Sequence, residues 1–446
     1  MHTAVLAKTA SYDLQSASLA ARNKCLQEIY AKLRDNQESI LEANSMDCIA
    51  AASSKDTPTA LMDRLSIGGK FTAILEGIQQ VIGMPDPLNR VDLARQLDTG
   101  LDLYRVSCPI GVLLVIFEAR PEVVVQITAL ALKTGNAVIL KGGKEAAHTN
   151  SILHDLIQSA IKESETLVSP DVVQLVTTRE AISTLLKCDK HIDLCIPRGS
   201  NELVTYIKSN TTIPVLGHSD GICTVFVDKS ADIQKAIAVI IDGKCEYPAA
   251  CNSTEKVLIH VDTSGSSIVA IIDALLQKNV VIYAAKECFD LVASTHVEAI
   301  KQHRISLAAE SHYDTEFISL KISIMLIDSV KSAISHINQR GSHHTDCIVT
   351  ESEESANLFM QNVDSAGVYH NASTRFADGF RYGFGAEVGV STNKIHARGP
   401  VGLEGLTSYK YRLYGDGHIV AAYNRDKKPY DRREIAFRDA QIRVDQ

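Results

Sequence analysis

The spacing of apolar residues along the chain predicts where helices and strands lie. From residue 12 to residue 83 apolar side chains recur every three or four positions, which predicts helices that end at Pro85 and Pro87. Residues 97–103 change to a short alternating pattern around Thr99-Gly100, which predicts a β-hairpin.

Strands and helices then alternate from residue 111. Short β-branched and aliphatic runs at 111–117, 137–140, 172–176 and 192–196 are typical of strands buried on both faces, and helical stretches at 122–134, 146–163 and 180–188 separate them. This alternation predicts right-handed βαβ units and a parallel sheet, with ligands bound beyond the C-terminal ends of the strands. A second α/β stretch runs from Cys223 to about residue 350, and residues 409–422 are strand-like.

Length and composition narrow the class of protein. At about 150 residues per domain, the 446 residues predict about three structural units. Asp and Glu number 53 against 45 Lys and Arg, and the net charge of −8 argues against a nucleic-acid-binding protein. The ten cysteines lack the spacing of a zinc site, no apolar run is long enough to cross a bilayer, and the N-terminus does not resemble a signal peptide. We therefore expect a cytoplasmic protein with reduced thiols and no metal, nucleic acid or membrane partner.

Two glycine-containing segments follow predicted strands and precede predicted helices. Lys141-Gly142-Gly143-Lys144 places two lysines beside a helix N-terminus, which favours a phosphate-bearing nucleotide, NADP rather than NAD, although a solvated turn has the same pattern. Arg198-Gly199-Ser200 repeats this context, and Ser200 contacts a second phosphate, caps the helix, or does both. The fingerprint G-x-G-x-x-G and the P-loop are absent from plausible positions.

Cys251 is the candidate nucleophile. It follows Tyr247-Pro248-Ala249-Ala250 and precedes a predicted strand, so it lies at the boundary of an element. A thiolate is a good nucleophile and leaving group for acyl transfer, whereas most cysteines are small buried hydrophobes. Residues 337–346 are dense in polar groups, which indicates a polar pocket wall or a surface loop. Residues 374–392 combine glycines with charges, which indicates backbone close to a ligand or a loop packed on itself.

Taken together, these segments resemble the γ-glutamyl phosphate reductases, a family within the aldehyde dehydrogenase superfamily. The resemblance covers roughly residues 10–425 and rests on the segments 111–122, 141–145, 197–200, 251–252, 336–346, 378–383 and 398–406. Arg340 departs from it, because the family usually carries His or Tyr before the Gly-Ser pair.

The resemblance implies an α/β, aldehyde dehydrogenase-like fold: a Rossmann-type cofactor domain, an α/β catalytic domain and a small β-hairpin oligomerisation flap. The NADPH-binding domain is expected at 1–95 and 109–218, the catalytic domain at 219–405, the flap at 96–108 and 406–425, and a charged tail at 426–446. A homo-oligomer, either a dimer or a tetramer, is expected, and a transient contact with glutamate 5-kinase is left open.

The resemblance also implies NADPH-dependent reduction of L-γ-glutamyl 5-phosphate to L-glutamate 5-semialdehyde and phosphate, the second step of proline synthesis from glutamate. Cys251 would form a thioester with the acyl group, and backbone N–H groups and Asn252 would hold the oxyanion. The cofactor would contact Lys141, Gly142, Gly143, Lys144, Arg198, Gly199, Ser200, Glu316 and Phe317, with Glu316 on the nicotinamide ribose. The charged ends of the small-molecule substrate would contact Arg120, Glu122, His344, Thr345, Asp346 and Arg381.

Hydrolytic aldehyde dehydrogenases carry a water-activating glutamate, and the corresponding segment here is Val215-Leu216-Gly217-His218. The missing carboxylate favours reduction of an acyl phosphate, because hydrolysis of the thioester would waste the activated substrate. Two alternatives stay open. The first is a CoA-acylating aldehyde dehydrogenase, against which segment 341–346 argues. The second is a non-catalytic scaffold, against which the intact Cys251, Lys144 and Glu316 argue.

Overall fold

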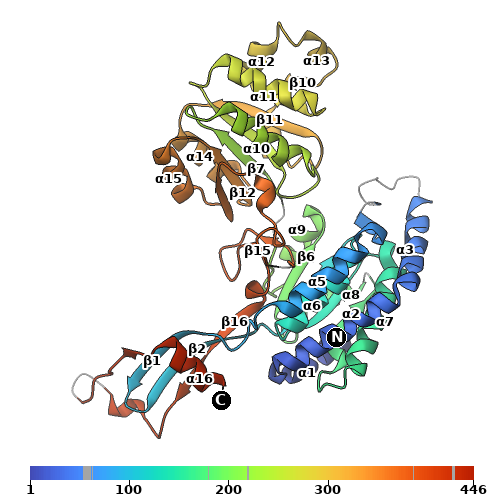
Figure 1. Cartoon of the computed structure of the whole chain (residues 1–446), viewed down its shortest axis with the longest axis vertical. Helices are drawn as coiled ribbons and strands as arrows, with labels where there is room; N and C mark the ends of the chain where they lie inside the picture. The colour runs from blue at the N-terminus through green and yellow to red at the C-terminus, as the bar shows by residue number, and fades with distance from the viewer. Residues whose placement is uncertain are drawn as a thin grey trace.

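The chain forms three structural units, which meet near β15 (Gly399–Pro400) and the start of β16 (Thr407–Tyr414), as Figure 1 shows. The computed structural model describes residues 1–53, 62, 64–178, 180–217, 220–384, 386–423 and 427–445. His218, the last residue of the segment in which the sequence predicts no water-activating base, lies outside the described residues.

The first unit is a four-stranded parallel sheet in the order β5-β4-β3-β6, with helices packed against it. Its strands are β3 (Val112–Phe117), β4 (Ala137–Lys141), β5 (Val173–Val176) and β6 (Leu194–Arg198). Its helices are α1 (His2–Ser16), α2 (Leu19–Asp35), α3 (Gln37–Ala52), α5 (Phe71–Gly83), α6 (Glu122–Lys133), α7 (Ala147–Glu163), α8 (Glu180–Leu185) and α9 (Asn201–Asn210). The predicted Rossmann-type sheet is therefore confirmed, and each strand lies within two residues of its predicted range.

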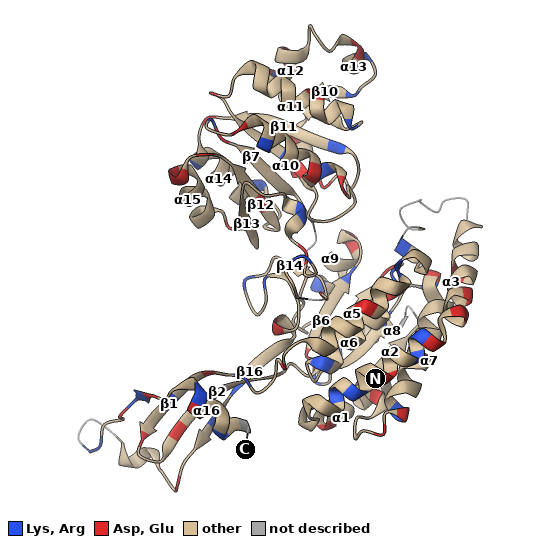
Figure 2. Cartoon of the chain, in the orientation of Figure 1, with Lys and Arg blue, Asp and Glu red and all other residues tan. Residues whose placement is uncertain are grey.

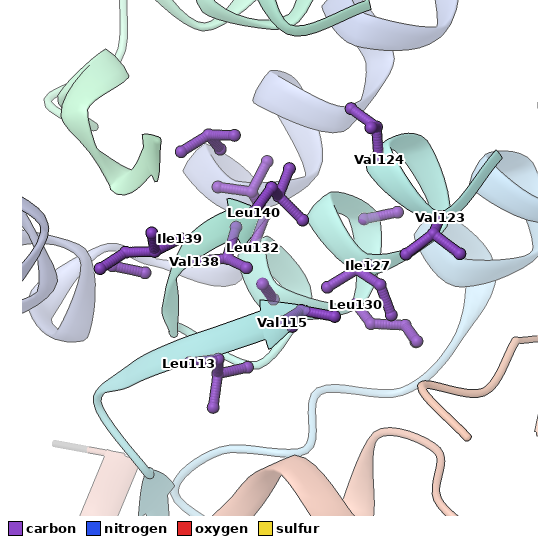
Figure 3. Packing of buried hydrophobic residues seen from close by; sticks show 14 of the residues in the cluster. Leu113, Val115, Val123, Val124, Ile127, Leu130, Leu132, Val138, Ile139 and Leu140 are labelled. Carbon is purple, nitrogen blue, oxygen red and sulfur yellow. The ribbon is translucent and has the colours of Figure 1, made fainter. Parts of the chain in front are cut away.

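The core of this unit explains why the strand prediction holds. Every residue of β3 and β4 is buried, because helices cover both faces of the sheet. Leu113 and Val115 of β3 belong to the same cluster as Ile127 and Leu130 of α6 (Figure 3). Strands of this kind need apolar residues at consecutive positions, and that pattern is visible in a single sequence.

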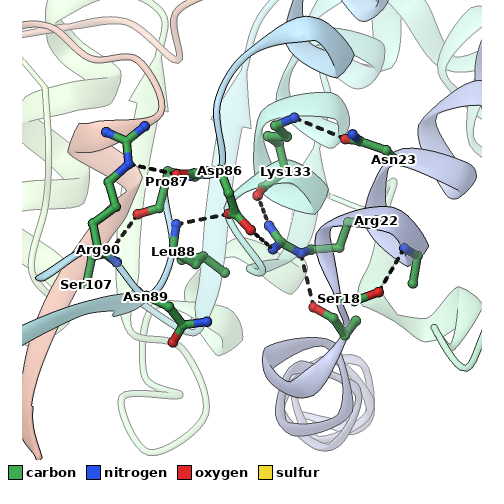
Figure 4. Close-up of polar contacts among 12 residues, drawn as sticks. Ser18, Arg22, Asn23, Asp86, Pro87, Leu88, Asn89, Arg90, Ser107 and Lys133 are labelled. Atoms are coloured by element: carbon green, nitrogen blue, oxygen red, sulfur yellow. Dashed lines mark hydrogen bonds and ion pairs between the residues drawn. The ribbon is translucent and has the colours of Figure 1, made fainter. Parts of the chain in front are cut away.

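Buried polar groups attach the N-terminal helices to this core. The guanidinium of Arg22 on α2 donates to Asp86 Oδ2 at 2.7 Å and to the carbonyl of Lys133 at the end of α6 (Figure 4). Lys133 Nζ in turn donates to Asn23 Oδ1 and to the Ile82 carbonyl, both at 3.0 Å. Because these buried groups satisfy one another, they join α2, α6 and the segment after α5.

The second unit is a seven-stranded parallel sheet in the order β10-β9-β11-β8-β7-β12-β13. Its strands are β7 (Cys223–Val227), β8 (Thr254–His260), β9 (Val281–Ala284), β10 (Ile305–Leu307), β11 (Lys321–Ile327), β12 (Thr345–Val349) and β13 (Gly367–His370). Its helices are α10 (Ile233–Cys245), α11 (Gly265–Gln277), α12 (Lys286–Val292), α13 (Val297–Lys301), α14 (Val330–Arg340) and α15 (Glu353–Asn362).

The third unit, the flap, is an antiparallel sheet in the order β16-β2-β1-β17. β1 (Val91–Asp98) and β2 (Leu101–Pro109) form the predicted hairpin around Gly100, whose φ is 75°, but the hairpin begins before residue 96. The segment expected as a charged tail supplies β17 (Arg433–Glu434) and α16 (Phe437–Asp445). Ala440 and Val444 of α16 are buried in the flap's own core.

The glycine-rich segment 374–392 leads from the second unit back to the first. Val388, Val401 and Leu406 belong to the first unit's core, although the sequence predicts a catalytic domain over 219–405. Acidic and basic residues are interspersed along the surface helices and flap strands drawn in Figure 2. No helix in the described ranges is long and apolar enough to span a membrane.

Candidate active site

Cys251 lies in a tight turn between α10 and β8. The Ser253 N–H donates to the Ala250 carbonyl at 2.9 Å, which closes the turn around a half-buried Cys251. Gly221, just before β7, passes directly beside this turn. A Cβ added at Gly221 would lie 2.0 Å from the Cys251 carbonyl oxygen and 2.7 Å from its Cα. Only glycine therefore fits beside the backbone of the candidate nucleophile.

The Asn252 side chain is held by the segment 375–377. Its Nδ2 donates to the Ala377 carbonyl at 3.0 Å and to the Arg375 carbonyl at 3.4 Å, and its Oδ1 accepts from the Arg375 guanidinium. Arg375 is buried and donates to Glu246 Oε2 at 2.7 Å. The amide thus ties the nucleophile's turn to the next segment, and both amide protons are used there rather than on the predicted oxyanion.

A fully buried ion pair lies next to the same turn. Lys244 Nζ of α10 is 2.6 Å from Glu255 Oε2 of β8, and neither side chain is accessible to solvent. Lys244 also donates to Ser253 Oγ at 3.4 Å. Burial raises the pKa of Glu255 to about 7, although Lys244 and the Phe317 N–H oppose the rise, and burial lowers the pKa of Lys244. The pair joins the nucleophile's turn to the segment that carries Phe317.

Glu316 lies on the other side of Gly221. Its carboxylate accepts a hydrogen bond from the Gly221 N–H, and burial raises its pKa above the ordinary value. Gly221 therefore separates Cys251 from the carboxylate predicted for the nicotinamide ribose. The Phe317 ring stacks on Tyr283 with 5.4 Å between the ring centroids, which fixes the direction of this segment.

The loops after β4 and β3 form one part of the predicted cofactor site. A Cβ at Gly142 would lie 2.2 Å from Asn150 Nδ2, and a Cβ at Gly143 would lie 1.9 Å from Glu145 Oε1. The Asn150 and Glu145 side chains therefore lie directly against the two glycines, and a larger residue at either position would have to displace them. Lys141 is buried and donates to the Gly142 carbonyl, whereas Lys144 is exposed at the start of the following helical turn.

The loop after β6 forms the other part. Ser200 caps α9, with its Oγ accepting from the Leu203 N–H at 3.4 Å, so the capping alternative is confirmed. The Ser200 N–H donates to Glu118 Oε2 at 3.0 Å, and a Cβ at Gly199 would lie 2.5 Å from that oxygen. A carboxylate therefore occupies the N-terminus of α9, which is a position suited to an anion.

Arg120 and Glu122 line one cavity of about 440 Å³, as predicted for residues that act together. Arg198, which the sequence assigns to the cofactor, lines the same cavity. The segment 378–387 forms another wall. Arg381 belongs to this segment and donates to Glu246 Oε1 at 3.4 Å, so its charge is paired.

The motif at 341–346 does not line that cavity. Residues 344–346 are buried at the start of β12, where Asp346 accepts from the Thr224 N–H at 2.8 Å. The Ser342 hydroxyl accepts from the Ile222 N–H at 2.8 Å. The motif therefore holds the beginning of β7, and with it Gly221, in place. The substrate contacts expected of His344, Thr345 and Asp346 stay a prediction. Burial lowers the pKa of His344, which lies near enough to Glu387 and Glu316 for their charges to oppose the lowering.

Arg340, the departure from the family pattern, has a defined role. Its guanidinium binds both carboxylate oxygens of Asp314, at 2.9 and 2.7 Å, and reaches Glu310 Oε2 at 2.8 Å. These contacts attach the end of α14 to the 3₁₀ helix η4 (Glu310–Asp314), immediately before Glu316. Arg340 thus supports the segment that carries the predicted cofactor carboxylate.

Cys195, Cys288 and Cys347 are buried in the cores of the two parallel sheets. Burial raises the pKa of Cys195, Cys288 and Cys347 to about 12, so these thiols stay protonated. In the part of the chain that the structure describes, no group of three His, Cys, Asp or Glu side chains is arranged to hold a metal ion.

The sequence analysis misses Gly221, Lys244, Glu255 and Arg375. A lone glycine such as Gly221 belongs to no sequence motif. The close contact that requires a glycine there exists only once β7 and β8 are paired. A signal for the ion pair does exist, because Glu255 lies within a strand that is buried along its whole length. A charged residue in such a strand requires a partner.

With this geometry established, comparison with known proteins identifies the family. Residues 2–302 match the aldehyde dehydrogenase family, and the chain belongs to that family of oxidoreductases, which use a nicotinamide cofactor and small-molecule substrates. The match includes Cys251, both cofactor loops and the start of the second sheet.

Relatives of the whole chain carry a more specific name. A probable gamma-glutamyl phosphate reductase from Schizosaccharomyces pombe is 47% identical over 423 residues, which is 94% of this chain and 92% of that protein. Gamma-glutamyl phosphate reductase 1 from Synechocystis sp. is 49% identical and covers 94% of this chain and 93% of its own length. The crystal structure of gamma-glutamyl phosphate reductase from Thermotoga maritima superimposes with a TM-score of 0.88 at 35% identity, covering 94% of this chain and 99% of that one.

Proposed function

We propose that the chain catalyses NADPH-dependent reduction of L-γ-glutamyl 5-phosphate to L-glutamate 5-semialdehyde and phosphate, the second step of proline biosynthesis from glutamate. One structural observation carries the proposal. Gly221 lies between Cys251 and Glu316, so a thiol nucleophile and a carboxylate suited to a ribose belong to one site. The relatives at 45–49% identity are named for the same reaction.

The chain's own residues account for the acyl transfer. The Cys251 thiolate attacks the γ-carbonyl carbon, the bond from that carbon to the phosphate oxygen breaks, and phosphate leaves with the electron pair. Backbone N–H groups of the turn hold the oxyanion, because the Asn252 amide is engaged by segment 375–377. Bound NADPH supplies the hydride that reduces the thioester carbon. The carbon–sulfur bond of the resulting thiohemiacetal then breaks, and the aldehyde leaves as the thiol is restored.

The residues present fit a dinucleotide. Gly142, Gly143 and Gly199 follow the C-terminal ends of β4 and β6, which is the edge where a parallel sheet binds its ligand, and Lys144 is exposed there. Lys141 and Lys144 would serve the 2′-phosphate, and Glu316 with Phe317 would hold the nicotinamide end. Ser200 would face the pyrophosphate in place of the Glu118 carboxylate that its N–H binds in this structure. These assignments favour NADPH over NADH.

The reverse reaction tests the function. Purified chain is mixed with glutamate 5-semialdehyde and NADP⁺, with and without inorganic phosphate, and NADPH absorbance is followed. Reduction of NADP⁺ that requires phosphate supports the proposal. Reduction without phosphate contradicts the absence of a hydrolytic step, and reduction that requires coenzyme A instead of phosphate supports a CoA-acylating enzyme.

We further propose a cytoplasmic homo-oligomer that assembles through the flap. β16 is an edge strand of the flap sheet, and Tyr409, Tyr411 and Leu413 on it are exposed. An unpaired edge with apolar side chains is suited to pairing with another chain. The ten free cysteines fit a reducing compartment. Light scattering of the purified chain, with Tyr409→Lys as a variant, measures the oligomeric state and the dependence on this strand.

A further inference from the structure

The cavity of about 440 Å³ lined by Arg120 and Glu122 carries charges of both signs. Helices α5 and α6 form two of its walls, and segment 378–387 forms a third. Arg120 reaches it from the loop after β3, and Arg198 reaches it from the end of β6. Ala119, whose φ of 46° is unusual for a residue with a side chain, makes the sharp turn that directs the chain into Arg120.

The two arginines lie near carboxylates, since Glu122 opposes the lowering of the Arg120 pKa and Arg198 opposes the rise that burial causes in the Glu387 pKa. Burial lowers the pKa of Arg120, and the neighbouring charges of Arg198 and Arg64 lower it further. Neither Arg120 nor Arg198 forms an ion pair with a carboxylate in the described part of the chain, and the nearby Glu246 is already bound to Arg375 and Arg381. Like charges brought together out of water are costly unless an anion binds between them. Arginine is suited to a carboxylate or a phosphate, because its planar donors bind both oxygens.

Glu122 supplies the opposite charge. Its Oε2 is buried and has no hydrogen-bond partner among the described residues. It lies close enough to Arg120 to affect its pKa, but the two side chains form no ion pair. Glu387, by contrast, accepts from the Gly379 N–H at 2.8 Å. A buried carboxylate oxygen without a donor is unfavourable, and an ammonium group would satisfy it.

The cavity is connected to the nucleophile. Tyr247, four residues before Cys251, lies near enough to Arg120 to raise its pKa. Asn252, next to Cys251, donates to the Ala377 carbonyl at 3.0 Å, and Asp378 follows in the cavity wall. A substrate attached to Cys251 therefore has a charged pocket within the same part of the molecule.

We propose that this cavity recognises the α-amino acid end of the substrate, with Arg120 and Arg198 on the α-carboxylate and Glu122 on the α-ammonium. The inference rests on the proposed function, because a γ-glutamyl group carries these two charges on one carbon, away from the reacting carbonyl. Under this proposal Arg198 binds the substrate, whereas the sequence predicts that it binds the cofactor.

The reverse reaction separates the possible ligands, since aldehyde, phosphate and NADP⁺ each have their own KM. Three aldehydes are compared: glutamate 5-semialdehyde with both charges, 5-oxopentanoate with the carboxylate alone, and pentanal with neither. The variants are Arg198→Gln, Arg120→Gln and Glu122→Gln, and Arg34→Gln on the exposed surface of α2 is the matched control.

Arg198→Gln and Arg120→Gln are expected to lower kcat/KM for the two carboxylate-bearing aldehydes by roughly 30-fold or more, and to leave pentanal and the KM for phosphate and NADP⁺ within about 3-fold. Glu122→Gln is expected to lower kcat/KM for glutamate 5-semialdehyde alone, by roughly 10-fold or more, and so to remove the preference over 5-oxopentanoate.

The contrary results are distinct. A raised KM for phosphate in Arg198→Gln would place the acyl phosphate's phosphate on the arginines, and a raised KM for NADP⁺ would return Arg198 to the cofactor. If the wild-type chain requires phosphate and the three variants have the same kcat/KM values as Arg34→Gln, the inference is overturned and the proposed function stands. A wild-type chain with no phosphate-dependent activity would overturn the proposed function, and with it this inference.

Discussion

The contact between Gly221 and Cys251 yields a sharp prediction for Gly221→Ala. The new Cβ would lie 2.0 Å from the Cys251 carbonyl oxygen, whereas an ordinary contact needs 3.4 Å or more. The obstacle is backbone, so no side-chain rotation can relieve it. Either the nucleophile's turn or residue 221 must therefore move by more than about 1 Å.

The size of the effect follows from that displacement. A misplacement of about 1 Å at a reacting group costs about 100-fold in rate, so kcat/KM in the reverse reaction should fall by about that factor. The KM for NADP⁺ should also rise, because the Gly221 N–H that binds Glu316 moves with the residue. Alkylation of Cys251 by iodoacetamide, read by peptide mass spectrometry, reports the altered turn independently of turnover.

Gly83→Ala is the matched control, since a Cβ added at Gly83 meets nothing within 4 Å. It should retain wild-type kinetics and wild-type alkylation. A folded Gly221→Ala variant within about 3-fold of Gly83→Ala in kcat/KM would refute the packing of this glycine against the nucleophile.

Three further outcomes follow from charged groups. Lys244→Met removes the ion-pair partner of Glu255 where solvent does not reach, so the carboxyl must stay charged without a partner or take a proton, and the free energy of unfolding in urea should fall by about 3–5 kcal/mol. Adding Glu255→Leu should restore most of it, and an unchanged single variant would contradict the buried pair. Burial lowers the pKa of His344 to about 4, whereas the unfolded imidazole binds its proton below a pH of about 6.5. The free energy of unfolding should therefore fall as the pH falls from about 6.5 to about 4, and it should fall by up to about 3 kcal/mol more in the wild type than in His344→Gln. An equal dependence of this free energy on pH in both proteins would refute the burial of His344. Arg340→Gln should raise the KM for NADP⁺ several-fold, because the segment that carries Glu316 loses its contacts with α14. The free energy of unfolding should fall by about 1 kcal/mol. An unchanged KM would mean that the contacts of Arg340 do not position the cofactor.

The parts of the fold that can be predicted are those whose burial dictates composition. β3 and β4 lie between two helical layers, so every position before Lys141 at the end of β4 is apolar, and the strands are visible in the sequence. α16 is the opposite case. Its packing on the flap rests on Ala440 and Val444 among charged neighbours, a pattern that a solvated tail shares. The boundary between the units is also hidden, because Val388 and Val401 return to the first core from far along the chain.

The candidate site divides in the same way. Cys251 is visible because it stands at an element boundary beside small residues, and Glu316 is placed through the resemblance. The polar residues 344–346 suggest a pocket wall, but β12 is a central strand of a parallel sheet, so its side chains are buried on both faces whatever their polarity. Arg198 ends β6 just before a βα turn that suits a cofactor, and it lines the cavity together with Asp378 and Glu387, far along the chain, which no local pattern reveals.

The most direct test of the central claim is the pre-steady-state formation of NADPH from glutamate 5-semialdehyde and NADP⁺ without phosphate, in wild type and in Cys251→Ala. The account predicts a burst of about one equivalent per wild-type chain, then a rate at least roughly 10-fold slower until phosphate is added, and no burst in Cys251→Ala. A burst that persists in the alanine variant, or fast steady turnover of the wild type without phosphate, would contradict a thioester on Cys251 that only phosphate resolves.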